Sequence, residues 1–176
     1  MRFTPAAIGA ALILASLSTA TSGQVAPIVI SPISLALMAE GERLQKTGDL
    51  TGAAEFYESS LAADPRNSTA YVALGQIAQA RGLTGSAIRH YREALALNPD
   101  NLDALAGEGS ALAQKGAVDR ARDTLARLTS ACRTQCPQIA RLQTAIAAGP
   151  TPSVVAARTV QAPPIPGQVP PPPKPQ

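Results

Sequence analysis

The stretch STAYVALGQIAQARGLTGSAIRHYREALALNPDN, residues 68 to 101, decides the fold, because its pattern recurs once before it and once after it. Apolar residues stand at helical spacing from 71 to 78 and again from 87 to 95. Gly82 separates the two runs and Pro99 closes the second, since a proline ring and its missing N–H cannot continue a helix. The stretch therefore predicts two amphipathic helices joined by a tight turn.

Corresponding residues of the successive copies form columns that stay in phase along the chain. These columns are Gly41/Gly75/Gly109, Gly48/Gly82/Gly116, Ala53/Ala87/Ala121 and Tyr57/Tyr91/Leu125, with Pro65/Pro99 closing the first two copies. Gly75 and Ala87, which have little or no side chain, are expected to lie where the two helices of a unit cross. Tyr91 is expected to fill the gap between these helices. Gly82 is expected to take the left-handed conformation that the turn requires.

A period of about 34 residues with these columns resembles the tetratricopeptide repeat family. The resemblance covers roughly residues 34 to 135 and implies an all-α fold, an α-solenoid of three helical hairpins at 34–67, 68–101 and 102–135. The third hairpin is a degenerate copy, because Arg133 stands where the other two have the closing proline. Terminal repeats are expected to be atypical, since they cap the stack.

The segments on either side of the repeats are predicted from their prolines and apolar residues. Residues 21–33 are predicted to be an extended linker, with Ser34 beginning the first helix, because prolines at 27 and 32 push the residues before them away from helical angles. Residues 136–149 are predicted to be a C-terminal capping helix with Pro137 in its first turn. Residues 150–176 form a proline-rich tail that we expect to be disordered.

Residues 1–20 have the pattern of an export signal. A basic start is followed by an apolar run from Pro5 to Leu17 and by the small residues Ser18, Thr19 and Ala20. The mature protein is therefore expected to be periplasmic or secreted, with no membrane span after cleavage. An uncleaved anchor is the alternative. The first cysteine is Cys132, so a lipid-attachment cysteine near the cleavage site is not expected.

Cys132 and Cys136 are the two cysteines of the chain and lie between the last repeat and the capping helix. In an exported protein such a pair is expected to form a structural disulfide. Cysteines four residues apart on an unbroken helix would be strained when bridged, so the helix is predicted to be interrupted there. A thiol-redox role for the same pair is the alternative.

The composition argues against an enzyme, a cofactor or a metal site. His90 is the one histidine and lies far along the chain from the cysteines, so neither a metal ligand set nor a nucleophile with its base is expected. The net charge of +3 is too small for a nucleic-acid binder. The first repeat is acidic, whereas no acid follows Asp123. This uneven charge has two interpretations. Either the charged residues at both ends are solvated, or the basic C-terminal end faces an anionic partner such as an acidic protein or an envelope polymer.

By resemblance, the first helix of each repeat lines a concave groove that holds an extended peptide or a partner helix. The residues expected to line it are Leu35, Met38, Glu42, Gln45, Thr69, Val72, Gln76, Gln79, Asp103, Ala106, Ser110 and Ala113. Its glutamines offer a peptide backbone both a donor and an acceptor. The expected function is a non-enzymatic adaptor for another envelope or secretion protein. The alternatives are a redox accessory acting through Cys132/Cys136 and a spacer that contacts the cell wall through the proline-rich tail.

Overall fold

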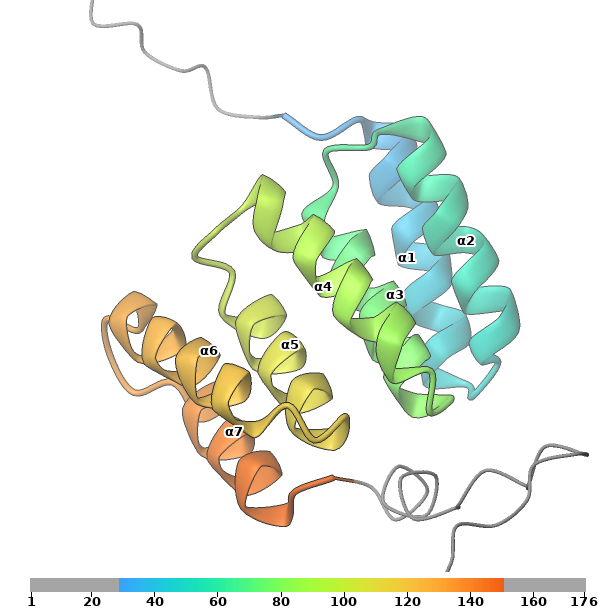
Figure 1. The fold of residues 1–176 in the computed structure, drawn as a ribbon. Helices are drawn as coiled ribbons and strands as arrows, with labels where there is room; N and C mark the ends of the chain where they lie inside the picture. Colours follow the sequence, from blue (N-terminus) through green and yellow to red (C-terminus); the bar gives the residue numbers. More distant parts are fainter. Residues whose placement is uncertain (1–28, 151–176) are drawn as a thin grey trace, which may run out of the picture.

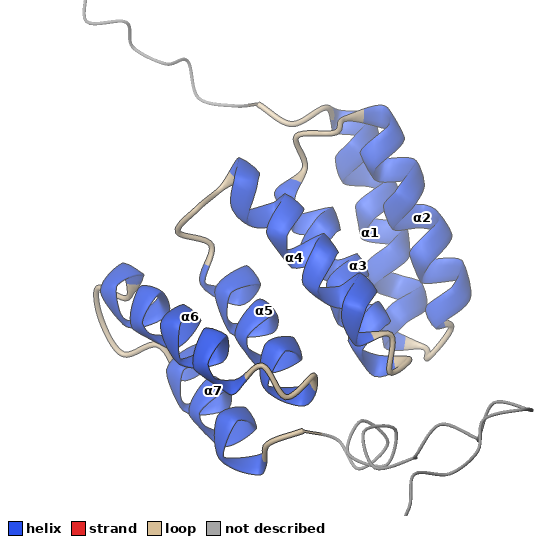
Figure 2. Cartoon of the chain, viewed as in Figure 1, coloured by secondary structure: helices blue, strands red, loops and turns tan. Residues whose placement is uncertain are grey.

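The computed structural model describes residues 29–150, which form seven helices in three successive hairpins and one additional helix (Figure 1). The helices are α1 (Pro32–Lys46), α2 (Leu50–Ala63), α3 (Ser68–Ala80), α4 (Thr84–Leu97), α5 (Leu102–Gln114), α6 (Val118–Ala131) and α7 (Pro137–Ala148). Between residues 29 and 150 the chain contains only helices and the loops that join them (Figure 2). The all-α solenoid with a capping helix is therefore confirmed. The predicted signal, the linker up to residue 28 and the tail from residue 151 lie outside the described residues.

The helices begin and end at residues whose chemistry explains the boundaries. Gly48, Gly82 and Gly116 have φ values of 87°, 72° and 82°, so the turn within each hairpin uses the left-handed conformation expected of Gly82. Asn67 and Asn101 cap α3 and α5 by accepting hydrogen bonds from the backbone N–H groups of Ala70 and Ala104.

The first helix begins earlier than the sequence predicted. α1 starts at Pro32 and not at Ser34, because a proline is well suited to the first helical turn, where its missing N–H would have no partner. The residues just before α1 are bonded to the loop that joins α2 to α3. The N–H of Ser31 donates to Oδ2 of Asp64 at 2.9 Å, and Nη2 of Arg66 donates to the carbonyl of Val29 at 3.3 Å.

Each of the first two hairpins closes on a glycine that faces a tyrosine ring. A Cβ atom on Gly75 would lie 2.6 Å from Cε1 of Tyr91, and one on Gly41 would lie 2.7 Å from Cε1 of Tyr57. Both distances are shorter than carbon atoms tolerate, so the helices cross this closely only without a side chain at these positions. The predicted roles of Gly75 and Tyr91 are confirmed.

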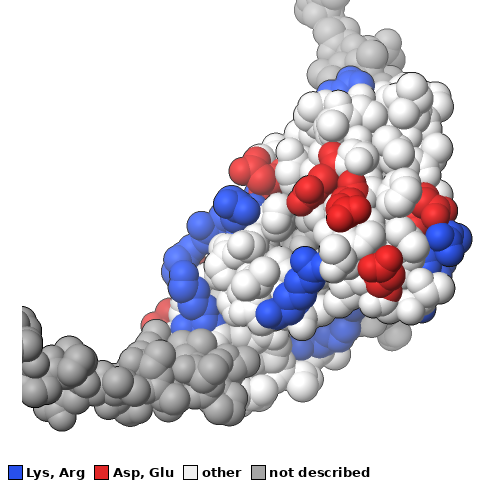
Figure 3. Space-filling view, turned by 90° about the vertical axis from the view of Figure 1, so that its right-hand side faces the viewer, with Lys and Arg blue, Asp and Glu red and all other residues white. Residues whose placement is uncertain are grey.

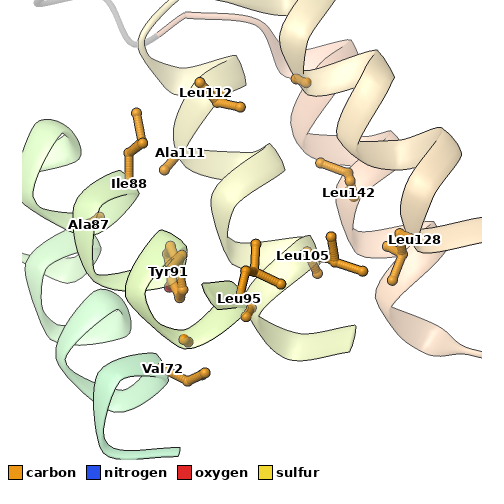
Figure 4. Close-up of a cluster of buried hydrophobic side chains, with 14 of the residues drawn as sticks. Val72, Ala87, Ile88, Tyr91, Leu95, Leu105, Ala111, Leu112, Leu128 and Leu142 are labelled. Atoms are coloured by element: carbon orange, nitrogen blue, oxygen red, sulfur yellow. The ribbon is translucent and has the colours of Figure 1, made fainter. Parts of the chain in front are cut away.

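The third hairpin closes differently, because its tyrosine position holds Leu125. A Cβ atom on Gly109 would meet the side chain of Leu142, which comes from α7. Leu142 is fully buried in the same apolar cluster as Leu105 and Leu128, so α7 packs on both helices of this hairpin (Figure 4). The capping helix thus supplies the bulk that a tyrosine supplies in the earlier hairpins.

The core consists of two apolar clusters. A separate group of buried polar side chains lies where the first three helices meet. The larger cluster extends from Val72 of α3 through Tyr91 of α4 to the last three helices (Figure 4). Ser34, Ser60 and Asn67 are buried where α1, α2 and α3 meet. Nδ2 of Asn67 donates to Oγ of Ser34 at 3.0 Å and to Oγ of Ser60 at 3.2 Å. This network joins the first repeat to the second.

Candidate functional site

A hollow on the molecule is formed by the first helices of two repeats and the capping helix. Its lining residues are Gln76 and Gln79 of α3, Asp103, Ala106, Gly107, Ser110 and Gln114 of α5, and Arg141 and Ala145 of α7. Amides, a hydroxyl, a carboxylate and a guanidinium thus surround a floor of small residues. Such a surface offers hydrogen bonds to an extended peptide.

A buried tyrosine fixes one of the glutamines at this hollow. The hydroxyl of Tyr91 donates to Oε1 of Gln79 at 2.8 Å, and Tyr91 itself is almost fully buried. Burial, together with the nearby carboxylate of Asp103, raises the pKa of Tyr91, so its hydroxyl stays protonated and remains a donor. Because Oε1 already accepts this bond, the amide nitrogen of Gln79 is the group best placed to meet a ligand.

Contacts between α5 and α7 involve two lining residues of the hollow, Asp103 and Arg141. Oδ1 of Asp103 accepts from Nε2 of Gln138 at 3.1 Å and from Nη2 of Arg141 at 3.3 Å. The side chains of Asp103 and Arg141 are 55% and 65% exposed, so this ion pair adds little stability. Both groups therefore remain accessible to a ligand.

Five of the residues expected to line the groove meet in this hollow: Gln76, Gln79, Asp103, Ala106 and Ser110. Two others, Glu42 and Gln45, line a separate hollow with Lys46 near the end of α1. Leu35 and Thr69 are exposed. Met38 is partly buried against the smaller apolar cluster.

The prediction that Val72 and Ala113 line the groove is wrong. Ala113 is 0% exposed and Val72 is 6% exposed, both belong to the larger apolar cluster, and neither lines the hollow, which the equally buried Ala106 does line. Val72 is covered because the third hairpin stacks on this part of α3. On α5 the exposed face continues from Ser110 to Gln114, four residues on, whereas Ala113 turns toward the core.

Sequence reasoning missed Gly107, Gln114, Arg141 and Ala145. Gln114 follows Ser110 at helical spacing, which is a signal present in the sequence. Arg141 and Ala145 were missed because α7 was expected only to cover the end of the stack. It also packs on α5, more extensively than on α6, and this brings Arg141 and Ala145 to the hollow.

The predicted disulfide is present at the junction of α6 and α7. Cys132 and Cys136 are bonded, and α6 ends at Ala131 while α7 begins at Pro137, so the predicted interruption of the helix is confirmed.

Among the described residues no group of histidine, cysteine and acidic side chains is arranged to hold a metal ion. None of the helices between residues 29 and 150 is both long enough and apolar enough to cross a membrane.

Stacked hairpins whose first helices line a hollow define a helical-repeat protein. Two family models, each described as tetratricopeptide repeat, match residues 38–84 and 78–146. The chain belongs to the tetratricopeptide repeat family. Among curated proteins none matches the sequence.

Solved structures share this fold at low sequence identity. The first tetratricopeptide domain of Spaghetti (RPAP3), bound to an HSP90 peptide, is 21% identical with a TM-score of 0.62, over 68% of this chain and 98% of that one. An O-GlcNAc transferase from Thermobaculum terrenum is 24% identical with a TM-score of 0.60, over 65% of this chain and 22% of that one. The Arabidopsis OM64 domain is 14% identical with a TM-score of 0.58, over 64% and 93%. At these identities the likeness establishes the fold alone.

Proposed function

We propose that this protein is a non-enzymatic adaptor that binds an extended peptide or a helix of another protein in the hollow between α3, α5 and α7. The observation that carries the proposal is the convergence of Gln76, Gln79, Asp103, Ser110 and Arg141, from three helices, on one surface. The peptide held by the related Spaghetti domain supports the same use of this fold.

The adaptor acts outside the cytoplasm, on an envelope or secretion protein. The pattern of residues 1–20 and the disulfide between Cys132 and Cys136 support this location, because disulfides persist in oxidising compartments. The mass of the mature protein, purified from the periplasm or the medium, tests it. Cleavage near Ala20 supports export, and an intact N-terminus on a cytoplasmic protein contradicts it. The tail that would contact the cell wall lies outside the described residues, so that alternative stays a prediction.

Photocrosslinking in intact cells tests the binding surface. A photoreactive residue at position 76 or 110 is expected to capture the partner, whereas one at Ala96, which is exposed on α4, is not. The captured protein is then purified and its affinity for the adaptor is measured. Gln76→Arg combined with Ser110→Arg is expected to weaken binding at least tenfold, and Ala96→Arg to leave it unchanged. Equal capture at Ala96, or unchanged affinity of the double variant, would place the partner elsewhere. Val72 is unsuitable for this test, because it is buried and a charge there would disrupt the fold.

A further inference from the structure

A second hollow lies between α4 and the turn that joins α5 to α6. It is lined by Gly85, Ile88, Arg89, Arg92, Glu93, Leu112, Lys115, Gly116, Ala117 and Arg120, and encloses about 380 Å³. It shares no residue with the hollow between α3, α5 and α7. Four of its residues are basic and one is acidic, so it differs from that hollow in charge as well as in position.

The basic character of this hollow is not a property of the repeat itself. One repeat earlier, the positions of Arg89 and Arg92 are held by Glu55 and Glu58, and the position of Arg120 is held by Ser86. The glycine of the turn and the alanine at the helix contact are the same at both junctions, whereas Ile88 and Leu112 stand where the earlier junction has Ala54 and Ala78. Packing therefore does not require the reversal from acidic to basic. Figure 3 shows basic side chains gathered in a band along the left-hand edge of one face, separate from most of the acidic ones.

The charges around the hollow leave it electropositive. Nε of Arg92 donates to Oε1 of Glu108 at 2.8 Å, and this nearly buried carboxylate fixes the direction of the arginine. Arg89 and Arg120 make no ion pair with any residue in the part of the chain that the structure describes. Two guanidinium groups at the rim are thus available, with Glu93 as the one carboxylate in the lining.

The first turn of α6 adds to this field. Ala117 occupies its cap position and has no side chain that could bond the first N–H groups, whereas Asp49 caps the corresponding helix α2. Asp119 in this first turn is paired with Arg122 at 2.9 Å. The free N–H groups and the helix dipole therefore favour a negative group here.

The floor and the rim together indicate the chemistry of the ligand. Ile88 and Leu112 are buried apolar residues that form part of the floor, which suits the methylene groups of an acidic side chain. Guanidinium groups bind carboxylates through paired hydrogen bonds. No aromatic residue lines the hollow, so stacking on a nucleic-acid base has no partner here. We propose that this hollow is a second binding site, which takes a glutamate-rich segment of a protein partner through Arg89 and Arg120.

Fluorescence anisotropy of a labelled octaglutamate peptide with the full-length protein at low salt tests the proposal. Binding is expected to weaken at least tenfold in Arg89→Glu and in Arg120→Glu, and by a smaller factor in Arg89→Lys, which keeps the charge but loses the paired hydrogen bonds. Arg127→Glu is the matched control, because it makes the same change in net charge on an exposed position outside this hollow, and it is expected to change affinity less than twofold.

Three results would overturn the proposal. One is the absence of measurable binding by the unaltered protein, and another is an equal loss of affinity in Arg89→Glu and Arg127→Glu, which would indicate a diffuse charge effect. The third is displacement of the peptide by an oligouridylate or by inorganic phosphate at lower concentration than unlabelled peptide. This hollow is separate from the hollow between α3, α5 and α7 that carries the proposed adaptor function. The variant Gln76→Arg, which alters that other hollow, is therefore expected to retain octaglutamate binding.

Discussion

The hydroxyl of Tyr91 donates to Oε1 of Gln79 at 2.8 Å, and one repeat earlier the hydroxyl of Tyr57 donates to Oε1 of Gln45 at 2.7 Å. In the third repeat the two positions are Leu125 and Ala113, so both polar partners are replaced together. The bond links the second helix of a hairpin to a side chain at the groove. The tyrosine that packs between the two helices of the hairpin therefore also fixes the orientation of the glutamine side chain.

Tyr91→Phe is expected to lower the free energy of unfolding by about 1 kcal/mol, because the hydrogen bond is lost while the ring keeps its contact with Gly75. Urea denaturation at neutral pH measures the difference. Tyr71→Phe is the control, since the hydroxyl of Tyr71 makes no hydrogen bond within the described residues, and a change below about 0.5 kcal/mol is expected. Equal losses in the two variants would show that the bond to Gln79 contributes nothing.

Asn67 and Asn101 occupy the same cap position in consecutive repeats but differ in what else they contact. Asn101→Ala removes a helix cap and is expected to cost about 1 kcal/mol. Asn67→Ala removes the same cap and also the donor to Ser34 and Ser60, whose hydroxyls are buried. Its expected cost is larger by about 1–3 kcal/mol, because buried polar groups lose a partner. Chemical denaturation of both variants gives the difference, and similar costs would mean that the network is energetically neutral.

Asp64 is expected to make stability depend on pH in the acidic range. Hydrogen bonds from the side chain of Arg66 and from the N–H of Ser31, followed by that from the N–H of Arg66, lower the pKa of Asp64 well below its usual range. The unfolded chain therefore takes up this proton at higher pH than the folded chain does. The stabilisation is complete above the unfolded pKa of about 3.9 and is lost as the pH falls below it.

Asp64→Asn is expected to melt at a lower temperature than the unaltered protein at pH 7, and the difference is expected to shrink between pH 5 and pH 3. Thermal unfolding followed by circular dichroism measures both. Asp119→Asn is the control, because the side chain of Asp119 is 95% exposed and its ion pair with Arg122 contributes little. A difference that stays constant with pH would mean that the ionised carboxylate of Asp64 is not the stabilising group.

The sequence was sufficient to predict the hairpins because the residues that close them are locally encoded. Gly75, Gly82 and Tyr91 each have a role that follows from size or backbone freedom, and all three roles are seen in the structure. The start of α1 was misplaced because Pro32 was interpreted only by its effect on the residue before it. A proline also favours the first turn of a helix, and that effect prevails here.

The groove was predicted less completely, because exposure depends on contacts between repeats as well as on helical spacing. Val72 lies one helical turn before Gln76 on α3, yet the stacking of the third hairpin covers it. Arg141 lines the hollow because α7 docks against α5. Neither fact follows from the periodicity of one helix, since both depend on how the next helix docks.

The close contact between Gly75 and the ring of Tyr91 gives the last prediction. Gly75→Ala is expected to lower the free energy of unfolding by about 1–2 kcal/mol, because the new methyl group would overlap the ring of Tyr91 and outweigh the higher helix propensity of alanine. Gly85→Ala is the matched control, since no atom lies within 4 Å of the added Cβ, and its effect is expected to be neutral or stabilising by up to about 1 kcal/mol. Repeating Gly75→Ala in a Tyr91→Leu background separates the two causes, because the smaller side chain leaves room for the methyl group. A cost that is unchanged in that background would mean that the ring of Tyr91 does not select glycine at position 75.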